Sequence, residues 1–264
     1  MRRTSLVVLA VALASATACG SSSSGASPAA GRTPVAAVLA ASTTTTQAGT
    51  AKVMLDVKSK AGDKAIDITG VGAFRLDGTL GSFAVTLNAG SGQPLTLEER
   101  TVGGLLYLKA PPLGDSYYSL KTDALLGTSL GQGTDPTLGL KLLKGAAEDV
   151  TVVGQEQVRG EQTTHYKGTY QLRKAVTALG GDLPKAFATQ LTASGDTPVP
   201  FDAYVDDKGR LRKLVTVSTV TTQGRSVVST ATTELYDFGA PVDVQAPPAD
   251  KVKDGTDLLK GLSG

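Results

Sequence analysis

The chain has 264 residues, of which 41% are hydrophobic and only 5% aromatic, and it contains no Trp. This length allows one large domain or two small ones with a real core, whose apolar mass must be mostly Ala, Val and Leu. Lys and Arg total 26 against 24 acidic residues; without Arg2 and Arg3, which lie in a segment that we expect to be removed, the mature chain has 24 of each. Binding to nucleic acid needs an excess of basic side chains on one face, so this balance excludes a nucleic-acid-binding protein.

Residues 1–18 have the three parts of an export signal: two arginines at the start, an apolar run, and small residues at the end. The apolar run is shorter than the ~20 residues of a spanning helix. The only Cys, Cys19, follows directly and precedes the polar stretch GSSSSG. This arrangement resembles a bacterial lipoprotein signal, in which the Cys thiol receives a diacylglycerol and becomes the new N-terminus. An ordinary secretory signal with an incidental Cys is the alternative. The composition of residues 19–33 predicts a flexible tether.

The pattern after the tether predicts one helix followed by a meander of strands. Pro34 suits the first turn of a helix over residues 34–45, which carries a short apolar stripe. From residue 51 the apolar residues alternate, which indicates strands. The predicted strands cover residues 51–58, 66–76, 83–87, 95–101 and 105–110. Short turns such as Gly103-Gly104 join them, so the sheet should be antiparallel.

The segment 110–133 lacks this alternation. We expect a long crossing connection there, with a helical turn at residues 124–126. Tyr117 and Tyr118 should be exposed in it, either at the rim of a pocket or holding the connection against the surface. A second helix is then predicted at Asp135-Pro136, with Leu138, Leu142 and Leu143 on one side.

Residues 150–172 read as two strands joined by a turn at residues 157–160. The alternation places Tyr166 and Tyr170 on the covered face and His165 on the polar face, so we expect His165 to be an exposed strand residue. The strongest helical pattern follows at residues 172–191, with a break expected at Gly180-Gly181 and Pro184.

The rest of the chain predicts a hairpin, a last strand and a surface tail. These elements cover residues 200–205 with 211–222, then 225–237, then 241–251. Asp206-Asp207 could suggest calcium, but a hairpin turn explains both residues without a metal. About ten strands and three helices, with helices that interrupt the meander, predict an α+β fold: a large antiparallel sheet with helices grouped on one face.

The sequence contains none of the catalytic or metal-binding motifs that we looked for. Cys19 and His165 cannot form a zinc site, and one Cys provides no disulfide framework. A Ser-His-Asp mechanism would need His165, and the chain has no G-x-S-x-G motif. We therefore expect no enzyme, no metal and no cofactor; carboxylate pairs that come together only on folding are the catalytic alternative that stays open.

Four motifs in order behind the Cys resemble one known family. They are the helix and first strand (PVAAVLAAS…AKVMLDVKS), the central V-x-G-x-E-x-V-x-G…HY, the hairpin DDKGRLRKL and the closing FGAPVDVQAPPADKV. Over residues 34–254 the chain is similar to the LppX/LprA/LprG lipoproteins of actinobacteria, relatives by fold of the LolA and LolB carriers; residues 255–264 would be a C-terminal tail. The resemblance implies a strongly curved half-barrel with its helices on the concave side and an apolar cavity between them that holds acyl chains.

The resemblance also implies a function and a set of residues. The protein would be anchored through Cys19 on the extracytoplasmic face of the cell membrane, and would bind a lipid or glycolipid and carry it within the envelope, with an envelope transporter or other protein as partner. The candidate cavity-lining residues are Phe74, Phe83, Val85, Tyr107, Tyr166, Tyr170, Leu179 and Phe187.

Two alternatives stay open at this point. Gly70, Gly72, Gly154 and Gly168 on the covered face could bend the sheet and leave volume for a ligand, or could only permit close packing. The fold could also serve a non-catalytic binding or sensory module for a protein partner, which a packed core and a large exposed apolar patch would favour.

Overall fold

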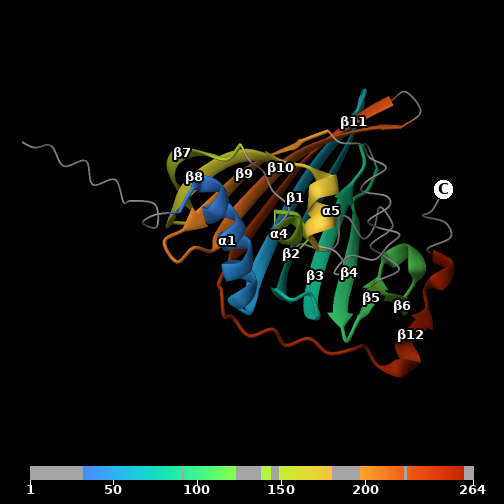
Figure 1. The fold of residues 1–264 in the computed structure, drawn as a ribbon. Coiled ribbons are helices and arrows are strands. Elements are labelled where there is room, and N and C mark those ends of the chain that lie inside the picture. The colour runs from blue at the N-terminus through green and yellow to red at the C-terminus, as the bar shows by residue number, and fades with distance from the viewer. Residues whose placement is uncertain are drawn as a thin grey trace, which may run out of the picture.

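A computed structural model describes residues 32–90, 92–122, 138–143, 149–179, 197–222 and 225–258, and these residues form one large curved sheet with helices on one side (Figure 1). The sheet has twelve strands in the order β12-β6-β5-β4-β3-β2-β1-β11-β10-β9-β8-β7. The strands are β1 Thr50–Ala61, β2 Lys64–Arg75, β3 Leu80–Asn88, β4 Leu95–Val102, β5 Leu105–Lys109, β6 Tyr117–Lys121, β7 Thr151–Val158, β8 Glu161–Tyr170, β9 Val199–Asp206, β10 Leu211–Thr222, β11 Arg225–Tyr236 and β12 Val252–Asp254. The predicted fold class is confirmed, with more strands than the expected ten.

The sheet consists of two antiparallel meanders that meet at one strand pair. Strands β1 to β6 follow one another across one half, and β7 to β11 across the other. The halves join where β1 pairs with β11, with Val53 opposite Leu235. The connection between β7 and β8 is Arg159-Gly160, with φ angles of 51° and 80°, as a two-residue hairpin turn requires.

Three helices lie on the concave side of this sheet (Figure 1): α1 Pro34–Gln47, α4 Leu138–Leu143 and α5 Leu172–Leu179. Helix α1 begins as predicted, because Thr33 Oγ1 accepts a hydrogen bond from Ala36 N at 3.3 Å and Pro34 occupies the first turn. Of the long helix expected over residues 172–191, the described residues contain α5; residues 180–191 lie outside them.

Polar residues on α1 fix it to its neighbours at the point where its apolar stripe stops. Ser42 Oγ donates to Leu140 O on α4 at 2.5 Å. Thr45 Oγ1 donates to Ala41 O at 2.6 Å and accepts from Leu211 N on β10 at 2.7 Å. Both side chains are fully buried, so their hydroxyl groups would be costly to leave without partners.

The prediction for residues 110–133 is wrong where the structure describes them. A short 3-10 helix, η1 Pro111–Leu113, is followed by strand β6. Tyr117 is only 9% exposed, and its hydroxyl donates to Glu98 Oε1 at 3.0 Å, while Tyr118 is half-buried, so the pair does not form an exposed rim. The helical turn expected at residues 124–126 lies outside the described residues.

The tail after β11 runs along one end of the sheet to its far edge, as Figure 1 shows. It contains a second 3-10 helix, η3 Ala249–Lys251, and then β12, which pairs in parallel with β6. The surface course of residues 241–251 was predicted; the added strand was not. Gly255 N donates to Ser119 O at 3.0 Å and extends this pairing.

Candidate functional site

The concave face of the sheet carries one continuous apolar cluster beneath the helices. Its members come from α1, α4, α5 and from strands of both meanders. Five of the predicted lining residues belong to it: Phe74, Phe83, Val85, Tyr166 and Tyr170. Burial raises the pKa of Tyr170 to about 12, which reflects how apolar its surroundings are.

The other predicted lining residues are not placed in this cluster. Tyr107 pairs with Arg100, and Phe83 pairs with the next residue of β4, Glu99. Successive residues of a strand face opposite sides, so Tyr107 lies on the face opposite to Phe83. Phe187 and the lipidation candidate Cys19 lie outside the described residues, as does the side chain of Leu179.

Three of the four glycines predicted on the covered face make room for aromatic rings. A Cβ at Gly70 would lie 2.5 Å from Phe83 Cζ, and one at Gly72 would lie 2.6 Å from Phe83 Cδ2. A Cβ at Gly168 would lie 3.1 Å from Phe201 Cζ. At these positions the close-packing alternative is therefore correct. The prediction for Gly154 is wrong: the bulge after Val152 pairs Gly154 with His165, so it lies on the other face of the sheet, where a Cβ would meet no atom within 4 Å.

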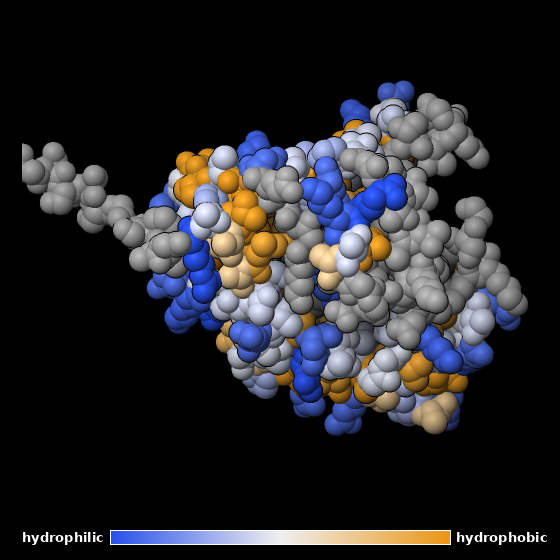
Figure 2. Space-filling view, in the orientation of Figure 1, coloured by the Kyte–Doolittle hydropathy of each residue, from blue (hydrophilic) through white to orange (hydrophobic). Residues whose placement is uncertain are grey.

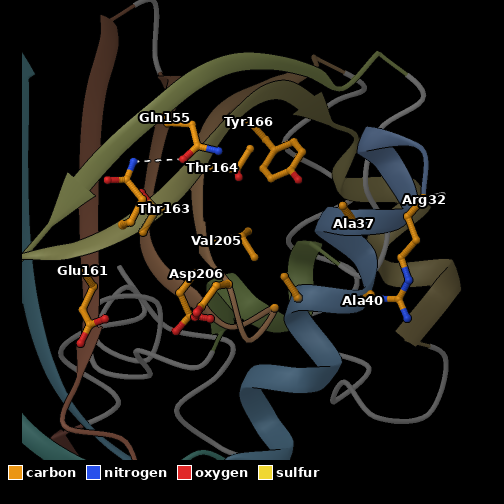
Figure 3. A pocket seen from close by; sticks show the side chains of 14 residues that line it. Arg32, Ala37, Ala40, Gln155, Glu161, Thr163, Thr164, Tyr166, Val205 and Asp206 are labelled. Carbon is orange, nitrogen blue, oxygen red and sulfur yellow. Dashed lines mark hydrogen bonds between the residues drawn. The ribbon is translucent and has the colours of Figure 1, made fainter. Parts of the chain in front are cut away.

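A hollow of about 270 Å³ opens beside α1, over the ends of β7, β8 and β9 (Figure 3). Its walls combine small apolar residues of α1 with polar strand residues. Lining residues are Arg32, Ala37, Ala40, Ala41, Gln155, Glu161, Gln162, Thr163, Thr164, Tyr166, Val205, Asp206, Asp207 and Gly209. Ala41, Tyr166 and Val205 belong both to this wall and to the apolar cluster, so the hollow is continuous with the concave face.

The size of this hollow limits what it can hold alone. Small-molecule pockets usually measure ~300–1,000 Å³, and this hollow lies just below that range. In Figure 3, Tyr166 and Thr164 of β8 point toward Ala37 of α1, while Gln155 and Gln162 bond to each other at 3.1 Å across the β7–β8 hairpin. An apolar wall and a hydrogen-bonding rim therefore lie side by side.

Glu99 is a functional candidate that the sequence analysis did not single out. It lies on the concave face, between Phe83 on β3 and Leu108 on β5, and is only 2% exposed. Burial raises the pKa of its carboxyl to about 8. The signal was present in the sequence: Leu95 and Leu97 alternate onto the covered face, and the next residue in that series is Glu99.

The expectation that His165 is exposed is wrong. His165 lies on the face of β8 opposite to Tyr166, as predicted, but the residue is only 8% exposed. Nδ1 lies 2.7 Å from Glu156 Oε1, Nε2 lies 2.7 Å from Asp202 Oδ1, and the ring stacks on Tyr204 with centroids 4.3 Å apart. Each ring nitrogen therefore has a carboxyl oxygen within hydrogen-bond distance, one from each neighbouring strand.

The Asp206 side chain accepts hydrogen bonds within the β9–β10 turn, as the hairpin interpretation predicted. Oδ1 accepts from Lys208 N at 3.1 Å and Arg210 N at 2.8 Å, and Oδ2 accepts from Arg210 Nη2 at 2.7 Å. Within the described ranges, no group of three or more His, Cys, Asp or Glu residues is arranged to hold a metal ion.

Exposed apolar side chains occur near α1 on the edge strand β7. Val152 and Val153 are 47% and 55% exposed, at the bulge between Val152 and Gly154. Figure 2 shows apolar atoms gathered at this end of the molecule among mainly polar ones. Of the helices that the structure describes, none combines the length and apolar character that crossing a bilayer would take.

Two solved structures are similar in fold to this chain. LprF of Mycobacterium bovis is 15% identical, with a TM-score of 0.47 over 82% of this chain and 97% of that one. LppX of Mycobacterium tuberculosis is 17% identical, with a TM-score of 0.44 over 79% of this chain and 98% of that one.

Two Streptomyces proteins are similar in sequence. An uncharacterized 31.2 kDa protein of Streptomyces griseus, encoded in the rplA–rplJ intergenic region, is 33% identical over 156 residues, or 54% of this chain and 48% of that protein. A candidate lipoprotein of Streptomyces coelicolor is 28% identical over 211 residues, or 69% of this chain and 62% of that protein. The chain thus spans less than two thirds of each. The LppX_LprAFG lipoprotein family matches residues 33–244, and the chain therefore belongs to that family.

Proposed function

We propose that this protein binds a lipid or glycolipid by its acyl chains on the concave face of the sheet and carries it within the cell envelope. The observation that carries the proposal is the continuity between the buried apolar cluster and the open hollow beside α1, through Ala41, Tyr166 and Val205. Membership of a lipoprotein family supports it.

The two parts of the hollow suit the two parts of such a ligand. Each methylene that leaves water contributes about 0.8 kcal/mol, so an acyl chain gains by lying against Ala37, Tyr166 and Val205. Arg32, Gln155 and Thr164 on the rim provide hydrogen-bonding groups for a polar head group. Binding of this kind is partition between bilayer and protein and requires no catalytic group.

We also propose that Cys19 carries the lipid anchor and holds the protein on the extracytoplasmic face of the cell membrane. The anchor would keep the carrier beside its source of ligand, although one or two chains bind a membrane less durably than a spanning helix. A second candidate function is the capture of a protein partner, and the exposed Val152 and Val153 on the edge strand β7 are the observation that favours it.

The first test is native mass spectrometry of the full-length chain with Cys19→Ala, produced in a bacterium and followed by solvent extraction. A stoichiometric added mass that extracts as lipid is the expected result. A clean apo mass, with no uptake from phospholipid or glycolipid vesicles, would refute lipid binding and leave the protein-partner function.

A pair of variants on α1 locates the site. Ala40→Trp places a large ring in the hollow and should lower the bound fraction of lipid severalfold, because Ala40 lines the wall. Thr43→Trp adds the same ring at an exposed position of the same helix and should leave binding unchanged. Equal loss in both variants would place the ligand elsewhere.

A further inference from the structure

Glu99 is a buried ionisable side chain on the concave face of β4, in the register of Phe83. Its exposed fraction is 2%, and its neighbours in the registered pairs are Phe83 and Leu108. Oε1 is fully buried and has no hydrogen-bond partner in the part of the chain that the structure describes. An unpaired buried oxygen of this kind costs stability, and a ligand atom that bonds to the carboxyl would offset that cost.

The basic side chains nearest in sequence on β4 and β5, Arg100 and Lys109, lie on the opposite face of the sheet from Glu99. Arg100 Nη2 donates to Glu98 Oε1 at 2.7 Å, and its guanidinium lies 5.1 Å from the Tyr117 ring centroid. Lys109 Nζ lies 5.6 Å from that ring and pairs in register with Glu98. These cations therefore stabilise Glu98, while the two residues that pair with Glu99 in the sheet, Phe83 and Leu108, are apolar.

Burial raises the pKa of Glu99 to about 8, so at neutral pH the carboxyl retains its proton. A protonated carboxyl offers one O–H donor, which an ionised carboxylate lacks. The group that such a donor fits in an apolar site is an acceptor without charge. An ester carbonyl meets this description, and every O-linked acyl chain carries one next to its methylene groups.

We propose that Glu99 is a polar recognition point on the β4 half of the concave face, separate from the rim of the hollow beside α1, and that its carboxyl O–H donates a hydrogen bond to the ester carbonyl oxygen of an acyl ligand. This inference rests on the proposed lipid-binding function and makes it specific: the preferred ligand class is ester-linked lipid. The proton stays on Glu99 and no covalent bond changes. The ligand oxygen satisfies the carboxyl group that the described residues leave unpaired.

The test uses two lipids that differ only in this carbonyl group. Vesicles contain equal parts of a phosphatidylcholine with two ester-linked palmitoyl chains and a phosphatidylcholine with two ether-linked hexadecyl chains. The full-length protein with Cys19→Ala is incubated with them, separated by gel filtration, and its bound lipid is quantified by mass spectrometry. The ratio of bound ester lipid to bound ether lipid reports the preference independently of overall affinity.

We expect the parent protein to prefer the ester lipid about 5- to 10-fold, the range of one net hydrogen bond. Glu99→Met, which removes the donor and fits an apolar site, should lower the ratio to about 1 while keeping the uptake of ether lipid. Glu99→Gln retains an N–H donor and should keep part of the preference. Glu98→Gln changes the neighbouring carboxyl on the opposite face and should leave the ratio unchanged.

The outcomes separate this inference from the proposed function. A ratio of 1 in the parent protein, or an unchanged preference in Glu99→Met, overturns the role of Glu99 while ether-lipid uptake still supports lipid binding. The absence of both lipids from the parent protein overturns lipid binding and the role of Glu99 together. A loss of ester preference confined to Glu99→Met supports both.

Discussion

Glu98 and Glu99 are adjacent on β4, yet their carboxyl groups face opposite sides of the sheet and meet opposite environments. Glu98 Oε1 accepts from Arg100 Nε at 2.9 Å and Nη2 at 2.7 Å, and from Tyr117 Oη at 3.0 Å. Glu99 lies opposite Phe83 on the concave face with Oε1 buried and unpaired among the described residues. The pKa of Glu98 is therefore lowered, since the hydrogen bonds outweigh its own partial burial, while burial raises the pKa of Glu99.

The first prediction concerns Glu99 and the pH dependence of stability. Its folded pKa of about 8 lies above the ordinary 4.5, so the folded chain holds a proton that the unfolded chain loses. The stabilising contribution is complete below about pH 4.5 and disappears as pH rises to about 8, with a slope of up to about 1.4 kcal/mol per pH unit. Glu99→Gln should remove this slope, as urea unfolding at pH 5, 6.5 and 8 would measure.

Glu98→Gln is the matched control for that prediction. A lowered pKa stabilises the fold above the unfolded value and loses this effect as pH falls through the folded value. The substitution should therefore destabilise the protein equally at pH 6.5 and pH 8 and leave the slope between them unchanged. A slope that persists in Glu99→Gln would show that another group causes it.

The second prediction concerns Gly72 and Phe83. A Cβ at Gly72 would lie 2.1 Å from the backbone oxygen of Ser82, which cannot move without disturbing the β2–β3 pairing. Gly72→Ala should cost about 1–3 kcal/mol, as overpacking of a core does. Gly154→Ala, where a Cβ meets no atom within 4 Å, should be nearly neutral. Chemical denaturation of both variants measures the contrast, and equal effects would contradict the ring-over-glycine packing.

The third prediction concerns the two carboxylates that bond to His165. Asp202 and Glu156 both approach the ring at 2.7 Å, but the Glu156 side chain is 52% exposed and that of Asp202 is 32% exposed. Solvent weakens the more exposed pair. Asp202→Asn should therefore lower the free energy of unfolding more than Glu156→Gln at neutral pH.

A double-mutant cycle with His165→Ala measures this directly. Asp202→Asn should show the larger coupling energy with His165, and the coupling should fall when salt is added. Coupling energies of equal size would show that the exposure of the carboxylates does not determine their strength.

The fourth prediction concerns the β9–β10 turn. Asp206 has a side chain only 1% exposed, and it pairs with Arg210 at 2.7 Å. Removing one partner leaves the other charge uncompensated, which costs about 3–5 kcal/mol for a buried pair, so Asp206→Ala should lower the melting temperature strongly. Asp207→Ala, at the exposed turn position beside it, should have little effect.

The turn interpretation also predicts the response to metal. Calcium and a chelator should leave the melting temperature of the parent protein unchanged, because the Asp206 oxygens already accept bonds from Lys208 N, Arg210 N and the Arg210 guanidinium. A rise in melting temperature with micromolar calcium would require a different arrangement of this turn.

The sequence by itself determined most of the local structure of this protein. Alternation and turn residues predicted the hairpins of both meanders except β5–β6, and Pro34 predicted the start of α1, because these signals act between residues close in the chain. The same alternation placed Tyr166 on one face and His165 on the other, correctly in both cases. The family also follows from motifs in order along the chain.

Only the tertiary structure decided which of these residues are buried and what they contact. Strand β12 exists because Val252 meets Tyr117 from the far end of the sheet, and three residues carry no strand pattern of their own. His165 is buried because Glu156, Asp202 and Tyr204 come from the two neighbouring strands. Gly72 accommodates a ring because the β2–β3 register puts Phe83 opposite it. Each outcome depends on contacts between distant segments, and local sequence patterns do not encode such contacts.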